Sequence, residues 1–183
     1  MSKYLGAMYR NAALAPIFLL TSSLGGAAEE GYGTYVIGLE PSTTEIKVDA
    51  GRLRDDGTFN AGVSPFEFQV PVNHYVIGRA KADTVHGIVS LRIDGETYNV
   101  CGSGKSPTFT VPEGKAIYLG DLTVEVRNGR PVFRLVRDLE LARLQIGLEQ
   151  PELAARLEPG ELTSKRVKTA CQGGLIIVPI YIG

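Results

Sequence analysis

The stretch that decides the fold is GIVSLRIDGETYNVC, Gly87–Cys101. Its apolar residues at 89, 91 and 93 alternate with polar residues at 90, 92 and 94, which is typical of a half-buried β-strand. Asp94-Gly95 is a strong signal for a two-residue hairpin turn, because a type I′ turn needs positive φ at both central positions. The stretch therefore predicts a β-hairpin.

The same two-residue period recurs on both sides of this hairpin. A second hairpin is predicted around Asn128-Gly129, and a polar, glycine-rich loop is predicted over Gly51–Pro65. In FEFQVPV we expect Phe68 and Val70 to face the core with Phe66. The remaining strands are predicted over Thr34–Glu40, Glu45–Gly51, Phe66–Val72, His74–Lys81, Ala116–Arg127, Arg130–Val136 and Gly173–Gly183, the last of them central or buried on both faces.

One segment, Arg137–Gly160, has helical spacing instead. Asp138 is a good N-cap, and Pro151 suits the first position of a second short helix. Leu141, Leu144 and Leu148 form a stripe on the first helix. We expect this leucine face to pack on the β body, with a partner-binding face as the alternative. The helical insertion is predicted to span about residues 138–158.

Composition agrees with a globular β protein. The chain of 183 residues has 44% hydrophobic and 21% charged residues, with 22 glycines and 10 prolines. The formal net charge of −1 gives no basic field for nucleic acid. The predicted fold is mainly β: a single antiparallel β-sandwich over residues 29–183, immunoglobulin- or transthyretin-like, with about seven to nine strands and a short helical excursion before the last one.

The first 28 residues read as a secretory signal peptide. Lys3 and Arg10 precede an apolar run from Ala12 to Leu20, and small residues follow at 25–28. The run is shorter than the roughly 20 residues that span a membrane. An uncleaved membrane anchor and a buried N-terminal helix are the alternatives. The cleaved signal predicts a periplasmic or otherwise exported protein, with membrane contact only through an uncleaved N-terminus.

The chain has two cysteines, Cys101 and Cys171. In an oxidising compartment such a pair predicts a disulfide. The alternative is a pair of buried, reduced thiols.

Gly104-Lys105-Ser106 resembles the end of a phosphate-binding loop. That motif needs a glycine five positions before Gly104, where this chain has Asn99, and a helix after the Ser. Pro107 and a strand-like segment follow instead. The sequence therefore excludes a nucleotide site and predicts a flexible loop over Gly102–Pro107, with Lys105 as a charge on that turn.

The sequence shows no catalytic, cofactor-binding or metal-binding set. The two histidines, His74 and His86, have no His or Cys nearby in the sequence, although Asp83 lies three residues before His86. Ser103 lies outside any nucleophile elbow. We expect no cofactor and no metal.

The segment Phe109–Val124 carries the turn Val111-Pro112-Glu113-Gly114 and the strand Ile117-Tyr118-Leu119-Gly120. This pattern, followed by a strand, a small helical segment and a final strand, resembles a set of uncharacterised bacterial exported β-sandwich proteins and lipoproteins with a "pG-x-x-vYiGd" motif. The resemblance implies the fold and the exported location. It implies no activity.

Two functions follow as expectations. The first is a non-catalytic envelope protein that binds another protein or a surface component, and neither nucleic acid nor nucleotide. The alternative is an exported enzyme whose site is assembled from scattered residues, for example His74, Asp83, His86 and Ser103.

Overall fold

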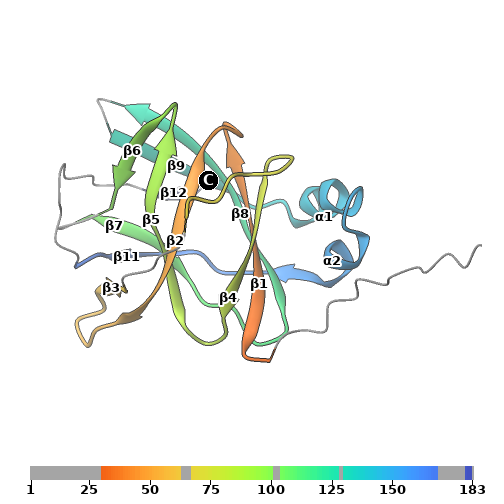
Figure 1. Cartoon of the computed structure of the whole chain (residues 1–183), viewed down its shortest axis with the longest axis horizontal. Helices are drawn as coiled ribbons and strands as arrows, with labels where there is room; N and C mark the ends of the chain where they lie inside the picture. The colour runs from red at the N-terminus through yellow and green to blue at the C-terminus, as the bar shows by residue number, and fades with distance from the viewer. Residues whose placement is uncertain (1–29, 63–66, 101–103, 128–129, 169–179, 183) are drawn as a thin grey trace, which may run out of the picture.

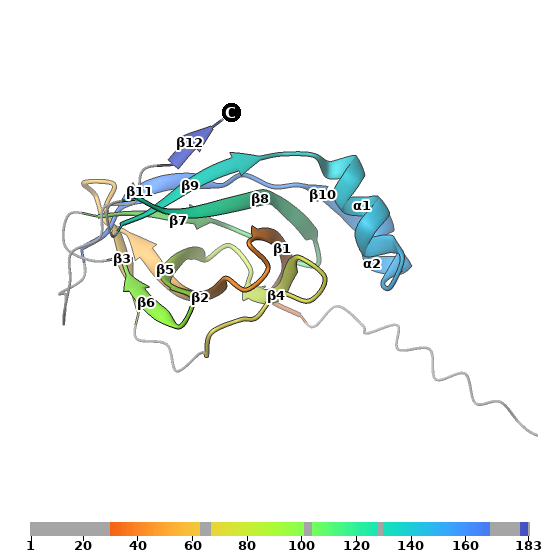
Figure 2. The same ribbon diagram turned by 90° about the horizontal axis from the view of Figure 1, so that it is seen from above.

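The computed structural model describes residues 30–62, 67–100, 104–127, 130–168 and 180–182. Their strands form two sheets that pack face to face, with two helices on the far side of one sheet (Figures 1 and 2). The predicted mainly β sandwich is confirmed. The predicted signal peptide, Cys101, Ser103 and Cys171 lie outside the described residues, so the signal and the disulfide stay predictions.

Sheet A has the strand order β12-β9-β8-β1-β4, and β10 pairs with the first part of β8. Three of its pairings are parallel (β1 with β8, β10 with β8 and β12 with β9), which the antiparallel prediction did not include. Its strands are β1 (Tyr32–Glu40), β4 (Tyr75–Lys81), β8 (Ala116–Arg127), β9 (Arg130–Val136), β10 (Leu157–Pro159) and β12 (Ile180–Ile182).

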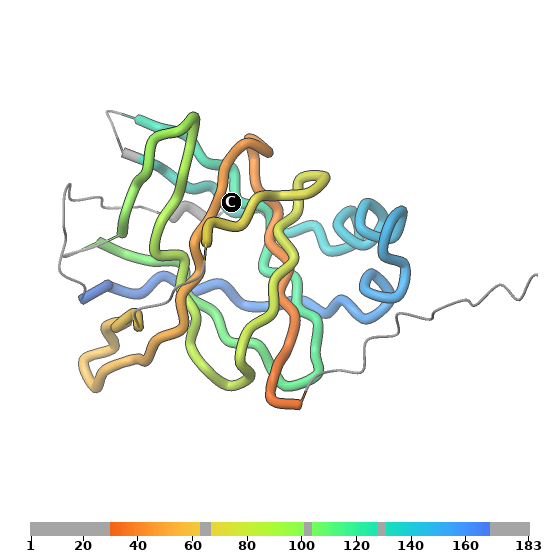
Figure 3. Tube along the Cα trace, in the orientation of Figure 1, coloured from red at the N-terminus to blue at the C-terminus, as the bar shows by residue number. Residues whose placement is uncertain are grey.

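Sheet B has the order β11-β7-β5-β2-β3, and β6 pairs with the second half of β5. The chain crosses from sheet A to sheet B in the turn between β4 and β5 (Figure 3). The strands of sheet B are β2 (Glu45–Leu53), β3 (Phe59–Ala61), β5 (Val85–Ile93), β6 (Glu96–Asn99), β7 (Lys105–Phe109) and β11 (Thr163–Arg166).

The hairpin that the sequence predicts around Asp94-Gly95 forms as expected. β5 and β6 pair antiparallel from Ile93↔Glu96 onward, and Asp94 and Gly95 have φ of 50° and 83°. These values fit the type I′ turn that the sequence indicates.

The core between the sheets is built from alternate residues, and a β-bulge shifts this alternation in β8. Ile117 and Leu119 point into the core before the bulge, and Leu122 and Val124 after it. Val36 pairs with Tyr118 but Gly38 pairs with Asp121, so β8 carries one extra residue, and Gly120 in it has φ of 110°. The bulge therefore turns Asp121 to the outer face of sheet A.

The helices α1 (Leu139–Gly147) and α2 (Pro151–Arg156) pack on that outer face. Asp138 caps α1 by accepting a hydrogen bond from Leu141 N at 3.0 Å, and Pro151 begins α2, both as predicted. A second apolar cluster joins the helices to the sheet. It contains Val36, Tyr75, Ala116, Tyr118, Ala142, Ile146, Leu153, Ala154 and Leu157.

The predicted burial of the leucine stripe is wrong. Leu141, Leu144 and Leu148 are 44%, 68% and 82% exposed, whereas Ala142 and Ile146 are buried. The small Ala142 and the β-branched Ile146 bring the helix close to Tyr75 and Tyr118, and this docking rotates the leucines toward solvent.

Other local predictions also need correction. Residues 67–72 form isolated bridges rather than a strand, and Val70 is 62% exposed while the Gln69 side chain is bonded to Tyr35. The predicted loop Gly51–Pro65 contains β3, paired with β2.

Lys105–Phe109 is strand β7 rather than part of a flexible loop. Three short strands follow the helices among the described residues, and the last of them, β12, covers only Ile180–Ile182 of the strand predicted over Gly173–Gly183 and pairs with β9. Residues 173–179 of that prediction lie outside the described residues.

Candidate functional site

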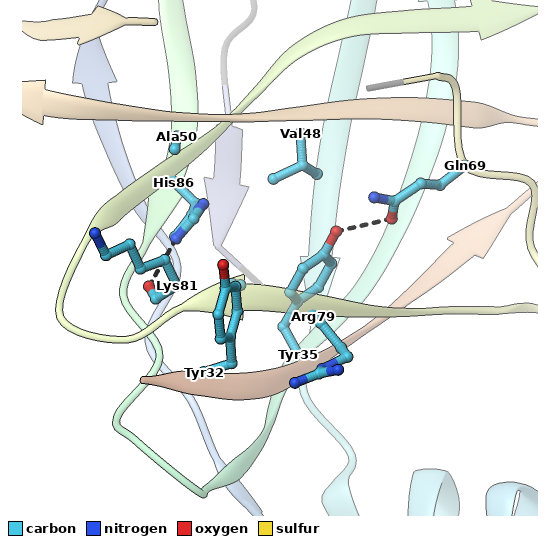
Figure 4. Close-up of a pocket in the computed structure, with 9 residues that line it drawn as sticks. Tyr32, Tyr35, Val48, Ala50, Gln69, Arg79, Lys81 and His86 are labelled. Atoms are coloured by element: carbon cyan, nitrogen blue, oxygen red, sulfur yellow. Dashed lines mark hydrogen bonds between the residues drawn. The ribbon is translucent and has the colours of Figure 1, made fainter. Parts of the chain in front are cut away.

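A pocket of about 410 Å³ opens where the two sheets meet beside the β4–β5 crossing (Figure 4). Sheet A contributes residues from β1 and β4, and sheet B contributes residues from β2 and β5. The volume lies within the range of small-molecule sites. The lining residues are Tyr32, Tyr35, Val48, Ala50, Gln69, Arg79, Ala80, Lys81 and His86.

Tyr35 forms one wall of the pocket and is 1% exposed. It pairs across the sheet with Gly78, and its ring occupies the space that a side chain at Gly78 would fill. Its hydroxyl donates a hydrogen bond of 2.8 Å to Gln69 Oε1 (Figure 4). Burial raises the pKa of Tyr35 to about 12, so the hydroxyl stays protonated at neutral pH.

His86 forms the opposite wall. Its Nε2 lies 3.0 Å from the carbonyl oxygen of Lys81, and its ring stacks on Phe109 with the centroids 5.7 Å apart. Burial lowers the pKa of His86, which outweighs the raising effect of the bond to Lys81. The imidazole is therefore neutral at neutral pH, with the proton on Nε2, because only a protonated nitrogen can donate to a carbonyl.

Two cations and an aromatic ring lie beside the pocket at strand β4. Arg79 and Lys81 alternate with Ala80, so their side chains leave sheet A on the face opposite to Tyr35 and Ala80, and Lys81 pairs directly with Tyr32. The Arg79 guanidinium lies 5.3 Å from the centre of the Tyr32 ring. Among the described residues that line the pocket there is no carboxylate.

A second polar cluster lies at the other end of β4, beneath α1. His74 Nε2 is 3.8 Å from Asp121 Oδ1, and a side chain at Gly38 would overlap this carboxylate. Asn73 and His74 have φ of 48° and 78°. The Asn73 side chain donates to Glu149, just after α1, so both residues of this left-handed turn have side-chain contacts.

Two oxygens of this cluster are buried without a hydrogen bond of ordinary geometry in the described structure: Tyr118 Oη and Asp121 Oδ1. The two side chains are still close enough to influence each other's pKa. Burial raises the pKa of Asp121, while Tyr118 and His74 lower it. Burial and the nearby Asp121 also raise the pKa of Tyr118 well above its usual value.

The structure separates the two histidines that the sequence suggested for a scattered catalytic site, and Ser103 lies outside the described residues. His74 precedes β4, whereas His86 lies in β5 near the other end of β4 and is hydrogen-bonded to the Lys81 backbone rather than to Asp83. Within the described ranges, no group of three or more His, Cys, Asp or Glu could hold a metal ion. No helix of the described residues is long and apolar enough to cross a membrane.

Sequence reasoning missed most of the pocket. Of its lining residues only His86 was a candidate, because it is one of two histidines. Tyr32, Gln69 and Arg79 follow no motif and meet only when β1 pairs with β4 and the segment before β4 folds over them. The one sequence feature that could have indicated the pocket is Gly78, which pairs with Tyr35 of the neighbouring strand and leaves room for its ring.

Comparison with protein-family models, curated proteins and solved structures finds no match for this chain.

Proposed function

We propose that this protein is a non-catalytic binding protein of the cell envelope, which holds a chemical group of a surface component or partner protein in the pocket between its sheets. The observation that carries the proposal is the pocket itself: about 410 Å³, with apolar and aromatic walls and a few polar groups directed into it.

The polar groups suit binding better than catalysis. Tyr35 is protonated and bonded to Gln69, and the His86 Nε2 proton is directed at a backbone carbonyl. Among the described residues, neither histidine contacts a nucleophile or forms an acid–base pair in the pocket, as general acid–base catalysis would require. Each group instead has a fixed orientation, which favours specific recognition.

The proposal includes export. Residues 1–28 have the pattern of a cleaved signal, and a Cys101–Cys171 disulfide would form in the oxidising space beyond the membrane. Mass spectrometry of the protein purified from cells tests both points, through the mass of the N-terminal peptide and through peptide mapping with and without reductant. An intact Met1 or two free thiols would contradict export.

A pocket-filling variant tests the binding function. Ala50 lines the pocket on β2, so Ala50→Phe fills part of the space, whereas Val126→Phe changes an exposed residue at the far end of β8. We expect a small-molecule and oligosaccharide fraction of the cell envelope to raise the Tm of the wild-type protein and of Val126→Phe but not of Ala50→Phe. An equal rise in folded Ala50→Phe would exclude the pocket as the binding site.

A further inference from the structure

We propose that the ligand of the pocket is an uncharged para-substituted phenol: a flat ring with a hydroxyl donor at one end and a hydrogen-bond acceptor, such as a carbonyl, at the other. This inference rests on the proposed binding function and names its ligand class. It follows from the inward-facing part of the lining alone, through its lack of charge, its aromatic surface and the two polar atoms at its ends.

Six of the lining residues share one space, which lies between the two sheets. Ala50 is two residues from Val48 on β2 and so shares its inward face, and it pairs directly with His86 on β5. Gln69 reaches the same space because its amide is bonded to the hydroxyl of Tyr35, a residue of the core between the sheets. The six are Tyr35, Val48, Ala50, Gln69, Ala80 and His86.

These six side chains are uncharged at neutral pH. The Tyr35 hydroxyl stays protonated because burial raises its pKa, and His86 is neutral because burial lowers its pKa. The pairing register directs the Arg79 and Lys81 side chains to the opposite face of sheet A. An ion in this space would lose its water without meeting an opposite charge, which favours an uncharged ligand.

The walls of this space favour a flat ring. Facing sheets are about 10 Å apart, and Ala50 on sheet B and Ala80 on sheet A are both too small to bridge that distance. The rings of Tyr35 and His86 both pack against Phe109, with centroids 4.9 Å and 5.7 Å from its own. The three rings therefore form one aromatic surface, on which a further ring packs favourably.

Two polar atoms that have no partner among the described residues lie at the ends of this space. Because His86 Nε2 donates to the Lys81 carbonyl, the other nitrogen, Nδ1, is an acceptor. Gln69 accepts from Tyr35 through Oε1, which leaves its amide NH₂ as a donor. Figure 4 shows Gln69 and His86 on opposite sides of Val48, with these two nitrogens turned toward it.

The separation of the two ends suits one small aromatic molecule. Gln69 pairs with Ile46 and His86 with Ala50, four residues further along β2, so the two positions are about 13 Å apart and the inward-turned side chains are closer. A para-substituted phenol holds its hydroxyl and its acceptor on one axis. It therefore donates to His86 Nδ1 and accepts from the Gln69 amide at the same time.

The space is also large enough for such a compound. At about 30 Å³ per water molecule, 410 Å³ corresponds to about 14 waters, close to the number of non-hydrogen atoms in a phenol with a short carbonyl chain. An aliphatic alcohol of the same length would leave the Gln69 amide unpaired, which weakens binding.

The probe is para-hydroxybenzylacetone, whose saturated linker keeps the phenol uncharged at pH 7. Four matched compounds each change one feature. Benzylacetone lacks the hydroxyl, para-butylphenol lacks the carbonyl, the ring-saturated analogue lacks the flat ring, and para-hydroxyphenylpropanoate adds a negative charge. By isothermal titration, we expect the probe to bind about tenfold more tightly than each of the four.

His86→Phe tests the end that takes the hydroxyl. Phenylalanine keeps a ring against Phe109 and removes Nδ1. We expect this variant to bind the probe no more tightly than benzylacetone, whose own binding shows that the variant is folded with an intact pocket. Arg134→Gln, an exposed change on β9, should keep the wild-type preference.

Gln69→Leu is the parallel test at the other end, where the preference for the probe over para-butylphenol should disappear. An analogue that binds as tightly as the probe overturns the feature that it lacks, and equal binding of the propanoate overturns the requirement for an uncharged ligand. A preference for the hydroxyl that persists in folded His86→Phe would overturn the role of His86.

An extended probe distinguishes the two sources of this chemistry. It is the amide of para-hydroxyphenylpropanoic acid with a long polyether amine. Binding equal to that of the short probe supports the phenolic end of a larger molecule, and loss of binding supports a free compound.

If none of these probes binds while the envelope fraction still stabilises the wild type and not Ala50→Phe, the ligand class is wrong and the binding function stands. If the envelope fraction also has no effect, the binding function itself fails.

Discussion

The ring of Tyr35 lies over Gly78 of the neighbouring strand, so closely that a Cβ on Gly78 would be 2.3 Å from Tyr35 Cζ and Oη. The missing side chain at 78 lets the tyrosine lie flat along β4 and reach Gln69 with its hydroxyl. One glycine thus sets the position of the pocket wall, although it does not line the pocket.

Gly78→Ala tests this relationship. We expect a loss of about 1–3 kcal/mol in the free energy of unfolding, because the buried ring must leave its position to admit the methyl group. Gly147→Ala is the matched control, since its Cβ would meet Ala154 at an ordinary 3.6 Å and alanine favours the helix. Urea denaturation measures both. A Gly78→Ala protein as stable as Gly147→Ala would show that the Tyr35 ring moves freely.

The neutral state of His86 predicts a loss of stability in acid. Its pKa is below the usual 6.5 in the folded protein, so below pH 6.5 the unfolded chain binds a proton that the folded protein does not. The free energy of unfolding should therefore fall from pH 7 toward pH 5. His86→Gln removes the titrating group, and its stability should fall less over this range.

Thermal denaturation at matched ionic strength across pH 5–7.5 measures this difference. Both proteins contain His74, so the two curves differ only through position 86. Parallel curves for wild type and His86→Gln would mean that His86 is as easily protonated in the folded protein as in the unfolded chain.

The raised pKa of Asp121 predicts the opposite dependence of stability on pH. Its pKa is above the usual 3.8, so as pH rises above 3.8 the unfolded chain releases its proton first and the folded protein is destabilised. Asp121→Asn lacks this titration. We expect the variant to gain stability relative to the wild type between pH 4 and pH 8, as measured by urea denaturation.

The gain should be larger in a His74→Asn background, because His74 lowers the pKa of Asp121 and asparagine tolerates the left-handed backbone at 74. An equal gain with and without His74 would show that the 3.8 Å contact between His74 and Asp121 has no energetic effect.

The leucine face of α1 predicts a contrast within one helix. Leu148→Gln should change the free energy of unfolding by less than about 0.5 kcal/mol, since the side chain is 82% exposed. Ile146→Ala should cost about 2–4 kcal/mol, since Ile146 is 5% exposed against sheet A. Chemical denaturation separates the two, and a large effect at Leu148 would mean that the leucine face is covered in solution.

Local patterns predicted the strands well because hairpin turns and alternation depend on neighbouring residues. Asp94-Gly95, the cap at Asp138 and the start of α2 at Pro151 all follow from chemistry within a few positions. The orientation of α1 could not be predicted in the same way. The helical periodicity suggested that the leucines face the core, whereas the buried residues are Ala142 and Ile146. The contact with Tyr75 and Tyr118 is made instead by the small Ala142 and the β-branched Ile146.

The pocket and the cluster around His74 and Asp121 both depend on contacts between segments that are distant in the sequence. Asp121 looks like one polar residue of an alternating strand until the bulge at Gly120 shifts it to the outer face. The pocket required the pairing of β1 with β4 and the contact of Gln69 with Tyr35, and neither has a local signature. Sequence alone therefore predicted the fold class and left the candidate site largely unseen.

The parallel pairing of β1 with β8 also limits how early β1 can be paired on both sides. A chain that emerges from its N-terminus can pair β1 with β4 early, but the other side of β1 has no neighbour until β8 arrives. Contacts of such high sequence separation slow folding. The N-terminal half should stay loosely structured until residues 116–127 are available, a property that would suit the export that we propose.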